Sequence, residues 1–349
     1  MANRAGKGAP PASVEELEER LSRPTKATVR AAERLGGDVV VLGAGGKMGP
    51  SLARLLLRSI AEAGASHRVV CVSRFGDAAA AEALERDGAR VVRCDLLEPG
   101  ALDALPDAPN VLYLAGTKFG SSSTPALTWA MNCLLPALAA ERYRSSRIVA
   151  LSTGNVYPFV SPRSGGATER TRPDPVGEYA QSCLGRERMF EYVSARSGAR
   201  VLLARLNYAT DLRYGVLADI ARTLAAGRPV DVTMGWLNTI WQGDANAVLV
   251  RALDHCASPP MAMNLTGPRI LSVREVAVRL AGLMGCPPPA FAGEEAPAAL
   301  LSNPTTCTGL YGLPSVSEER IVEWTAHWVA AGLPSLDRPT HWETRDGRF

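Results

Sequence analysis

The sequence lacks the features that mark membrane, secreted and nucleic-acid-binding proteins. No apolar run reaches the ~18 residues of a membrane span, and residues 1–11 lack the apolar stretch of a signal peptide. The formal net charge is only +3 and the basic residues are scattered, so no basic surface for nucleic acid is indicated. These absences favour a soluble protein with neither a membrane nor a nucleic-acid partner.

Residues that carry thiol, imidazole or ammonium groups are also sparse. The chain has seven cysteines, an odd number without a C-x-x-C pair, so a reduced, cytoplasmic setting is favoured over a disulfide framework. Its four histidines show no metal-ligand spacing, and we therefore expect no metal site. Only four lysines are present, so few ammonium groups are available to a catalytic site.

The most informative segment is residues 39–49. Four consecutive apolar residues at 39–42 indicate a buried parallel strand, and the glycine-dense turn behind them leads into helical periodicity from Pro50. This order is typical of a dinucleotide-binding βαβ unit. Its glycines allow a sharp turn, the approach of a pyrophosphate and close packing of the helix on the strand. A chain of 349 residues, 46% hydrophobic, can build one large or two modest domains around this unit.

The end of the second strand, expected at residues 69–74, bears on the choice of cofactor. A carboxylate there would hydrogen-bond the 2′-hydroxyl of NAD, whereas an arginine can pair with the 2′-phosphate of NADP. The sequence has Ser73 and Arg74 at this point, which favours NADP. The alternative is that Arg74 stacks on adenine or faces solvent, which would leave NAD as the cofactor. Further strands are expected at 91–96, 111–116 and 148–157.

Several segments, taken in order from about residue 37 to residue 324, resemble the extended short-chain dehydrogenase/reductases, specifically the NAD-dependent epimerase/dehydratase family. The resemblance lies in Gly43, Gly46 and Gly49 as G-x-x-G-x-x-G, the strand exit 114–116, Asn132, the segments 151–157 and 168–179, Arg205 to Tyr208, 240–244 and 263–267. It implies an α/β fold, a Rossmann-type doubly wound parallel sheet with a smaller C-terminal substrate-binding domain. The expected division is an N-terminal helical arm (1–36), a dinucleotide-binding domain (37–206 and about 239–266), a substrate-binding domain (207–238 and 267–333) and a C-terminal tail (334–349).

The chemistry that the resemblance implies uses a tyrosine and a lysine four residues apart on one helix, with a serine or threonine from the fifth strand. An ammonium group must stabilise the phenolate, because tyrosine with a pKa near 10 is a poor base at neutral pH. Tyr179 and Thr153 fit two of these positions, but the lysine position is Cys183. In a first account another cation substitutes, with Lys118 after the fourth strand as the main candidate and Arg186 as a weaker one. In a second, Cys183 itself transfers a proton or adds to a carbonyl. In a third, the site binds a dinucleotide without turnover.

The resemblance also implies further site residues. The expected cofactor-binding residues are Gly43, Gly46, Lys47, Met48, Gly49, Ser73, Arg74, Asp95, Leu96, Ala115, Gly116, Lys118 and Tyr179. The expected substrate-binding residues are Asn155, Asn207, Tyr208, Trp236 and Trp241. No lysine or arginine lies between Arg228 and Arg251, where relatives that act on nucleotide-diphosphate sugars generally carry cations, so we expect a smaller or less anionic ligand. The two tryptophans read equally well as core residues.

The sequence therefore predicts an NADP- or NAD-dependent oxidoreductase or epimerase acting at a hydroxyl or carbonyl carbon of a sugar-like small molecule. The alternative is a non-catalytic dinucleotide-binding sensor or interaction protein on the same scaffold, which Cys183 favours. A homodimer is expected, because the helix of the catalytic tyrosine commonly joins a dimer bundle in the resembling family. Here Met189, Phe190 and Tyr192 extend that helix with apolar side chains.

Overall fold

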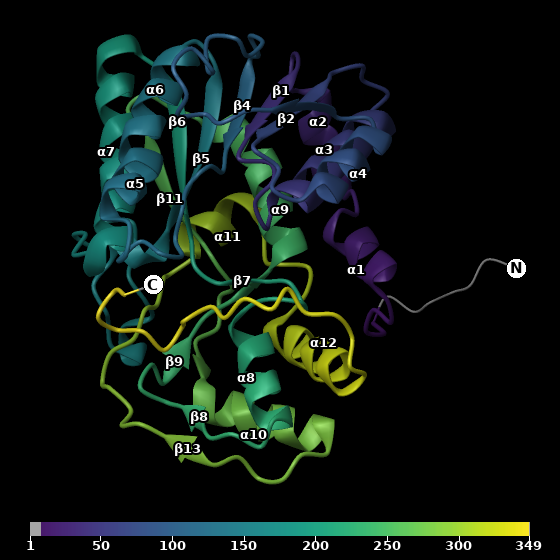
Figure 1. Cartoon of the computed structure of the whole chain (residues 1–349), viewed down its shortest axis with the longest axis vertical. Helices are drawn as coiled ribbons and strands as arrows, with labels where there is room; N and C mark the ends of the chain where they lie inside the picture. Colours follow the sequence, from purple (N-terminus) through teal and green to yellow (C-terminus); the bar gives the residue numbers. More distant parts are fainter. Residues whose placement is uncertain (1–7, 349) are drawn as a thin grey trace, which may run out of the picture.

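A seven-stranded parallel sheet forms the centre of the protein in a computed structural model that describes residues 8–348 (Figure 1). The strand order is β11-β6-β5-β4-β1-β2-β3. The strands are β1 (Val39–Leu42), β2 (Val69–Ser73), β3 (Arg90–Arg93), β4 (Asn110–Tyr113), β5 (Arg147–Thr153), β6 (Arg200–Leu206) and β11 (Met261–Leu265). The chain moves outward from β1 in one direction through β3 and then in the other from β4. The fold is therefore the doubly wound α/β sheet that the sequence predicted, with its topological switch point between β1 and β4.

Helices cover both faces of this sheet because alternate side chains of each strand point to opposite sides. Val39 and Val41 face one core, and Val40 and Leu42 face the other. The first core is covered by α2 (Lys26–Glu33), α3 (Gly49–Glu62), α4 (Ala78–Arg86), α9 (Gln242–Ala252) and α11 (Thr305–Tyr311). The second is covered by the π-helix η1 (Ala130–Leu134), α6 (Leu135–Arg142) and α7 (Gly177–Ser197), and α5 (Pro125–Trp129) packs on η1 and α7. We call the sheet with these helices the sheet lobe.

A second lobe lies at the end of the sheet where β5 and β6 finish (Figure 1). Its helices are α8 (Val216–Ala225), α10 (Val273–Met284) and α12 (Glu318–Ala330). Three pairs of short strands connect them: β7 (Ala209–Thr210) with β10 (Ile240–Trp241), β8 (Val230–Asp231) with β13 (Phe291–Ala292), and β9 (Trp236–Leu237) with β12 (Leu271–Ser272). The single-turn helices η2 (Gly154–Val156), η3 (Pro162–Ser164) and η4 (Leu253–His255) complete the elements. This lobe has a separate apolar core.

The N-terminal arm packs on its own chain. Helix α1 (Val14–Leu21) begins at Ser13, whose hydroxyl accepts a hydrogen bond from the Glu16 amide at 3.2 Å. Leu17 and Leu21 are buried in the core of the second lobe, whereas α2 packs against the sheet lobe. The arm therefore bridges the two lobes, and residues 1–7 of the predicted arm lie outside the described residues.

The C-terminal tail also bridges the lobes. After α12 the chain crosses between them and ends near the start of α7, as the yellow trace in Figure 1 shows. Trp342, in the middle of this tail, is 6% exposed and belongs to the second core. A segment that reads as a polar tail is thus an anchored part of the fold.

Within residues 8–348, no helix is both long and apolar enough to cross a membrane. All seven cysteines fall in this range, and each is a free thiol.

Candidate functional site

The glycine turn after β1 lies at the switch point of the sheet. Gly43 has φ +85°, and a Cβ atom there would lie 2.5 Å from the amide nitrogen of Ala115 at the end of β4. A Cβ atom on Gly49, at the start of α3, would overlap the carbonyl oxygen of Ala44. Side chains are therefore excluded at the turn and at the contact between helix and strand, as a dinucleotide-binding turn requires.

An outer cavity of about 400 Å³ extends from this turn past the ends of β2, β3 and β4. Its lining includes the predicted residues Gly43, Gly46, Ser73, Arg74, Asp95, Leu96, Ala115 and Gly116. A guanidinium nitrogen of Arg74 lies 3.6 Å from a carboxylate oxygen of Asp95, and the Arg74 side chain is 68% exposed. The structure thus brings the outer set of predicted cofactor residues to one cavity.

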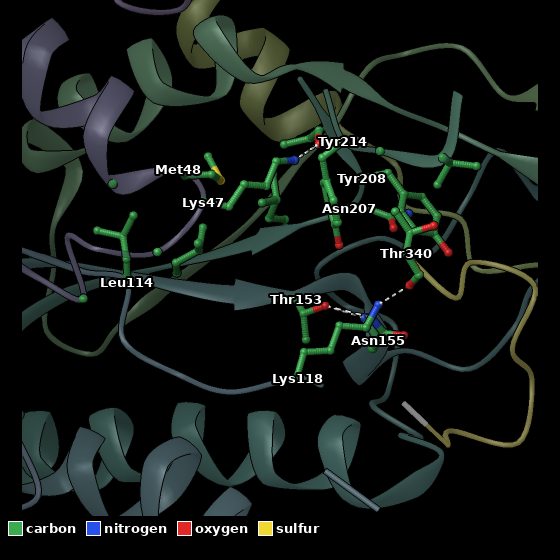
Figure 2. Close-up of a pocket in the computed structure, with 18 of the residues that line it drawn as sticks. Lys47, Met48, Leu114, Lys118, Thr153, Asn155, Asn207, Tyr208, Tyr214 and Thr340 are labelled. Atoms are coloured by element: carbon green, nitrogen blue, oxygen red, sulfur yellow. Dashed lines mark hydrogen bonds between the residues drawn. The ribbon is translucent and has the colours of Figure 1, made fainter. Parts of the chain in front are cut away.

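An inner cavity of about 250 Å³ begins at the same turn and extends toward the second lobe (Figure 2). It is lined by the predicted residues Gly43, Gly46, Lys47, Met48, Gly49, Lys118, Thr153, Asn155, Tyr179, Asn207 and Tyr208. Gly43, Gly46 and Leu114 line both cavities. The two cavities are therefore adjacent parts of one groove over the carboxyl ends of the strands, where open α/β sheets bind ligands.

Tyr179 and Thr153 meet at the inner cavity from different elements. Tyr179 lies in the first turn of α7, and Thr153 is the last residue of β5. Burial raises the pKa of Tyr179, and Cys183 raises it further, while the charge of Arg186 and a hydrogen bond with Thr153 oppose the rise. Thr153 Oγ1 also accepts a hydrogen bond from Asn155 Nδ2 at 3.0 Å. At neutral pH, Tyr179 is thus an uncharged phenol that can donate a proton.

Cys183 lies one turn after Tyr179 but does not reach the inner cavity. Its side chain is fully buried and packs in a small cluster with Val156, Tyr157 and Ala167. Burial raises the pKa of its thiol, which leaves it neutral and unreactive as a nucleophile at neutral pH. Cys183 also shares a hydrogen bond with Tyr179, which lowers the pKa of the thiol and raises that of the phenol, so the thiol packs behind the phenol and outside the cavity.

Lys118 brings an ammonium group to the same cavity from the chain after β4. Its Nζ donates a hydrogen bond to the carbonyl oxygen of Thr340 in the C-terminal tail at 3.0 Å (Figure 2). It lies 5.9 Å from the centre of the Tyr179 ring. Burial lowers the pKa of Lys118 to about 8. The cation that the first account requires is therefore within the electrostatic range of Tyr179.

A second cation, Arg186, is buried beneath the site with 6% of its surface exposed. Its Nη1 donates to the carbonyl oxygen of Leu151 and its Nη2 to Oδ1 of Asn132, each at 2.7 Å. Asn132 sits in the π-helix η1 and also holds the backbone of Thr117, next to Lys118. Arg186 therefore supports the scaffold through hydrogen bonds and acts on Tyr179 only through its charge.

Lys47, one of the expected cofactor-binding residues, reaches from the glycine turn to residues that follow β6. Its Nζ donates to the carbonyl oxygen of Ala209 at 2.7 Å and lies 4.2 Å from the ring centre of Tyr214 (Figure 2). Burial lowers its pKa to about 8. These two partners draw the ammonium group toward the inner cavity, and Lys47 does not line the outer one.

The two predicted substrate tryptophans do not line the inner cavity. Trp241 is 3% exposed and packs edge to face on Trp324, with ring centres 5.3 Å apart. Trp236 is half-buried against the same core. Trp241 therefore follows the alternative interpretation as a core residue, and Trp236 packs partly against the same core.

Asn207 and Tyr208, in contrast, do line the inner cavity. Asn207 Nδ2 donates to Asn238 Oδ1 at 3.1 Å, which holds its amide in the wall. Tyr208 has φ +49°, a left-handed conformation that is costly for an aromatic residue and that tends to occur at functional sites. Burial raises the pKa of its phenol.

Some lining residues were not predicted. Tyr214, Val216 and Thr340 line the inner cavity, and Arg338 lines the outer one. Tyr214 and Val216 belong to the loop before α8 and its first turn, and the other two to the tail. No motif marks these positions, since they reach the site only through the packing of the second lobe. Among residues 8–348, no three His, Cys, Asp or Glu side chains are grouped to hold a metal ion.

Comparison with known proteins supports the family resemblance seen in the sequence. The model of the NAD dependent epimerase/dehydratase family matches residues 39–260. No curated protein matches the chain. The UDP-glucose 4-epimerase of Thermotoga maritima, solved with UDP-glucose, is 17% identical, with a TM-score of 0.70 over 84% of this chain and 98% of that chain.

Two further solved structures share the fold at similar distance. The UDP-glucuronic acid 4-epimerase of Bacillus cereus in complex with NAD is 17% identical, with a TM-score of 0.70 over 84% of this chain and 98% of that chain. The dTDP-glucose 4,6-dehydratase of Bacillus anthracis in complex with NAD is 14% identical, with a TM-score of 0.71 over 84% and 96%. The family match spans most of the sheet lobe and includes both the glycine turn and the tyrosine helix. The chain therefore belongs to the NAD-dependent epimerase/dehydratase family.

Proposed function

We propose that this protein is an NAD(P)-dependent oxidoreductase or epimerase that acts at a hydroxyl or carbonyl carbon of a sugar-like small molecule. The observation that carries the proposal is that Tyr179, Thr153 and Lys118 line one cavity that begins at the glycine turn. A phenol, a hydroxyl and an ammonium group at one place are the groups that proton transfer at a substrate oxygen requires.

The residues present fit a dinucleotide. Gly43 and Gly49 leave no room for side chains at the turn, and the continuous groove passes from Arg74 at the outer cavity to Tyr179 at the inner one. We propose that the outer cavity holds the adenosine half and that Arg74 selects NADP, with NAD as the alternative. The Bacillus relatives were solved with NAD, which supports a nicotinamide dinucleotide of either kind. The bound nicotinamide ring would supply a hydride acceptor.

The protein's own residues would manage the proton. Tyr179 Oη would donate a proton to, or accept one from, the reacting oxygen of the substrate, and Thr153 Oγ1 would hold that oxygen in place. Burial alone makes the phenolate too unstable, so a nearby positive charge is needed when Tyr179 acts as a base. Lys118 and Arg186 supply this charge in place of the lysine that Cys183 replaces.

The substrate would be small. The inner cavity, at about 250 Å³, is below the ~300–1,000 Å³ of sites for drug-sized ligands, and the nicotinamide ring would share it. Its walls offer the polar groups of Asn155, Asn207 and Tyr208, which suit a molecule rich in hydroxyl groups. The Thermotoga relative was solved with the larger UDP-glucose, so nucleotide-diphosphate sugars belong in any test. The second lobe, which holds most of residues 207–238 and 267–333, would form the substrate-binding domain, although α11 within that range packs on the sheet lobe.

We also propose a homodimer. Phe190 is fully buried in the sheet lobe and does not contribute to an interface, but Tyr192 on the same helix is 56% exposed. Leu127, Leu134 and Leu138 on the neighbouring helices are 44–52% exposed. These side chains give the α5–α7 side of the molecule an apolar surface that a second copy would cover.

The experiment is a panel assay. Monosaccharides, sugar acids and nucleotide-diphosphate sugars are mixed with the protein and NAD or NADP, and reduced dinucleotide and epimerised product are measured. Turnover by the wild-type protein that is lost in Tyr179→Phe supports the enzyme. Tight dinucleotide binding with no turnover across the panel would instead support the sensor.

A further inference from the structure

The C-terminal tail, residues 334–348, is fastened across the groove at several points, and we call it the strap. The amide of Leu336 donates to the carbonyl oxygen of Arg213 at 3.2 Å. Thr340 donates to Oδ2 of Asp219 through its amide at 2.8 Å and through its hydroxyl at 2.6 Å. Arg345 donates to the carbonyl oxygen of Ala298 at 2.8 Å. The strap therefore has a defined path between the two lobes, which the yellow trace in Figure 1 follows, and its residues Thr340 and Arg338 line the inner and the outer cavity.

Arg338 lies between the first two of these fastenings. It lines the outer cavity, which also contains Ser73 and Arg74, and a neighbouring cavity of about 440 Å³, which also contains Lys47 and Pro50. Gly45, Gly46 and Arg338 line both of these cavities. Arg338 is exposed and lies beside the central glycines of the turn, and it also lines a third cavity that contains Asp219 and Glu343. Burial raises the pKa of Tyr214, and the charge of Arg338 opposes this rise.

The strap holds Arg338 there without giving its charge a partner. Among residues 8–348, no hydrogen bond or ion pair engages its guanidinium group. Burial lowers the pKa of a different residue, Arg222, and the negative charge of the neighbouring Asp337 opposes this fall. Asp337 and His341, on either side of the segment, have φ +49° and +52°, so the backbone bends sharply before Arg338 and after Thr340. A cation kept beside a glycine turn by a bent and fastened segment is placed to meet an anion.

We propose that Arg338 binds the pyrophosphate of the dinucleotide, so that the strap forms the outer wall of the cofactor site. The inference rests on the proposed function, because the anion is part of the proposed cofactor. A guanidinium group forms paired hydrogen bonds with phosphate oxygens, which suits it for this position. The strap also carries the Thr340 carbonyl that holds Lys118, so one segment contacts both the pyrophosphate and the catalytic cation.

The test separates the pyrophosphate from the rest of the cofactor. Adenosine, ADP, NAD and NADP are titrated by calorimetry into the wild type, Arg338→Ala, Arg338→Lys and Arg348→Ala. Arg348 is a matched control, because it lies in the same strap, is 83% exposed, pairs with Asp346 and lines neither cavity. Arg338→Ala should weaken ADP, NAD and NADP by a common factor of up to about 5, because Arg338 is exposed and exposed ion pairs are weak. Adenosine should be unaffected, Arg338→Lys should recover part of the loss, and Arg348→Ala should match the wild type.

A second readout follows the strap itself. ADP should protect the segment around Arg338 from proteolysis and from amide hydrogen exchange in the wild type, whereas adenosine should not. In Arg338→Ala this protection by ADP should be lost while the melting temperature of the free protein stays the same.

These measurements separate failure of the Arg338 proposal from failure of the proposed cofactor. If the wild type binds dinucleotides and Arg338→Ala binds ADP, NAD and NADP equally well, the strap has no role in phosphate binding and only the inference falls. A loss confined to NADP would place Arg338 at the 2′-phosphate and would also overturn it. Failure of the wild type to bind any of the four probes would overturn the proposed cofactor, and this inference with it.

Discussion

Replacing Arg74 with alanine tests the choice between NADP and NAD. Arg74 lines the outer cavity beside Ser73, where a 2′-phosphate would lie. A hydrogen bond between charged groups contributes about 1.5–3 kcal/mol, but exposed ion pairs contribute only about 0–1 kcal/mol. Arg74 is 68% exposed and its guanidinium lies 3.6 Å from Asp95, whose negative charge disfavours a second anion. We therefore expect about 1 kcal/mol, or a loss of about fivefold in NADP affinity.

The assay is titration of both dinucleotides by calorimetry or by protein fluorescence at low and high salt. NAD affinity should change little in Arg74→Ala, and the NADP effect should shrink at high salt because exposed charges are screened. Asp95→Asn is the informative companion, since removal of the competing carboxylate should raise NADP affinity. An equal loss of NAD and NADP affinity in Arg74→Ala would refute this reasoning and leave Arg74 as a residue that contacts adenine or solvent.

Three further predictions address stability, pH dependence and assembly. Gly49→Ala should lower the free energy of unfolding by about 1–3 kcal/mol in urea denaturation, because its Cβ would overlap the Ala44 carbonyl. Gly282 lies in an exposed part of α10 with open space around it, so Gly282→Ala should instead raise the free energy of unfolding by up to about 1 kcal/mol. If the Lys118 ammonium group is needed, activity should fall as pH rises through about 8, because Lys118 loses its proton there. In Lys118→Arg this fall in activity should move to higher pH. An unchanged pH profile in Lys118→Arg would exclude Lys118 as the cation. Leu134→Glu with Leu138→Glu should convert the dimer to a monomer in sedimentation, and a wild-type protein that is already monomeric at micromolar concentration would contradict the dimer.

The sheet was largely predictable, because its signals are local. The apolar run at 39–42 became β1 with the expected bounds. The fourth strand was expected at 111–116 but ends at Tyr113. Leu114 and Ala115 pack against the two cores of the sheet lobe, so the apolar run continues past the point where the strand pairing ends.

The candidate site was predictable only where a motif carries it. Tyr179, Thr153 and the glycine turn converge as the family pattern implies. The positions of Arg338 and Thr340 depend on how the strap folds back across more than a hundred residues, and no local pattern encodes that path. Trp241 shows that residue type alone does not predict a site, since an indole that suits a sugar site suits the core of the second lobe equally well.

The departure at Cys183 makes the source of the positive charge the central question. Cys183 is buried and neutral, so Cys183→Ser should be mild if the thiol only packs. Were the thiol the proton donor, Cys183→Ser would cost about 10²-fold or more, the scale of general acid–base catalysis. Cys183→Lys would restore the family pattern, at the cost of placing an ammonium group in an apolar cluster.

The most direct test is a double-mutant cycle on Lys118 and Tyr179, measured as turnover of a substrate identified in the panel. If Lys118 keeps Tyr179 in a usable pKa range, Lys118→Met and Tyr179→Phe should each lower the rate by a similar large factor. The double variant should be little slower than either single one, because groups that act as a unit are not additive. Independent, multiplicative losses would contradict the unit of Lys118 and Tyr179, and unchanged turnover in all three variants would remove Tyr179 from the chemistry altogether.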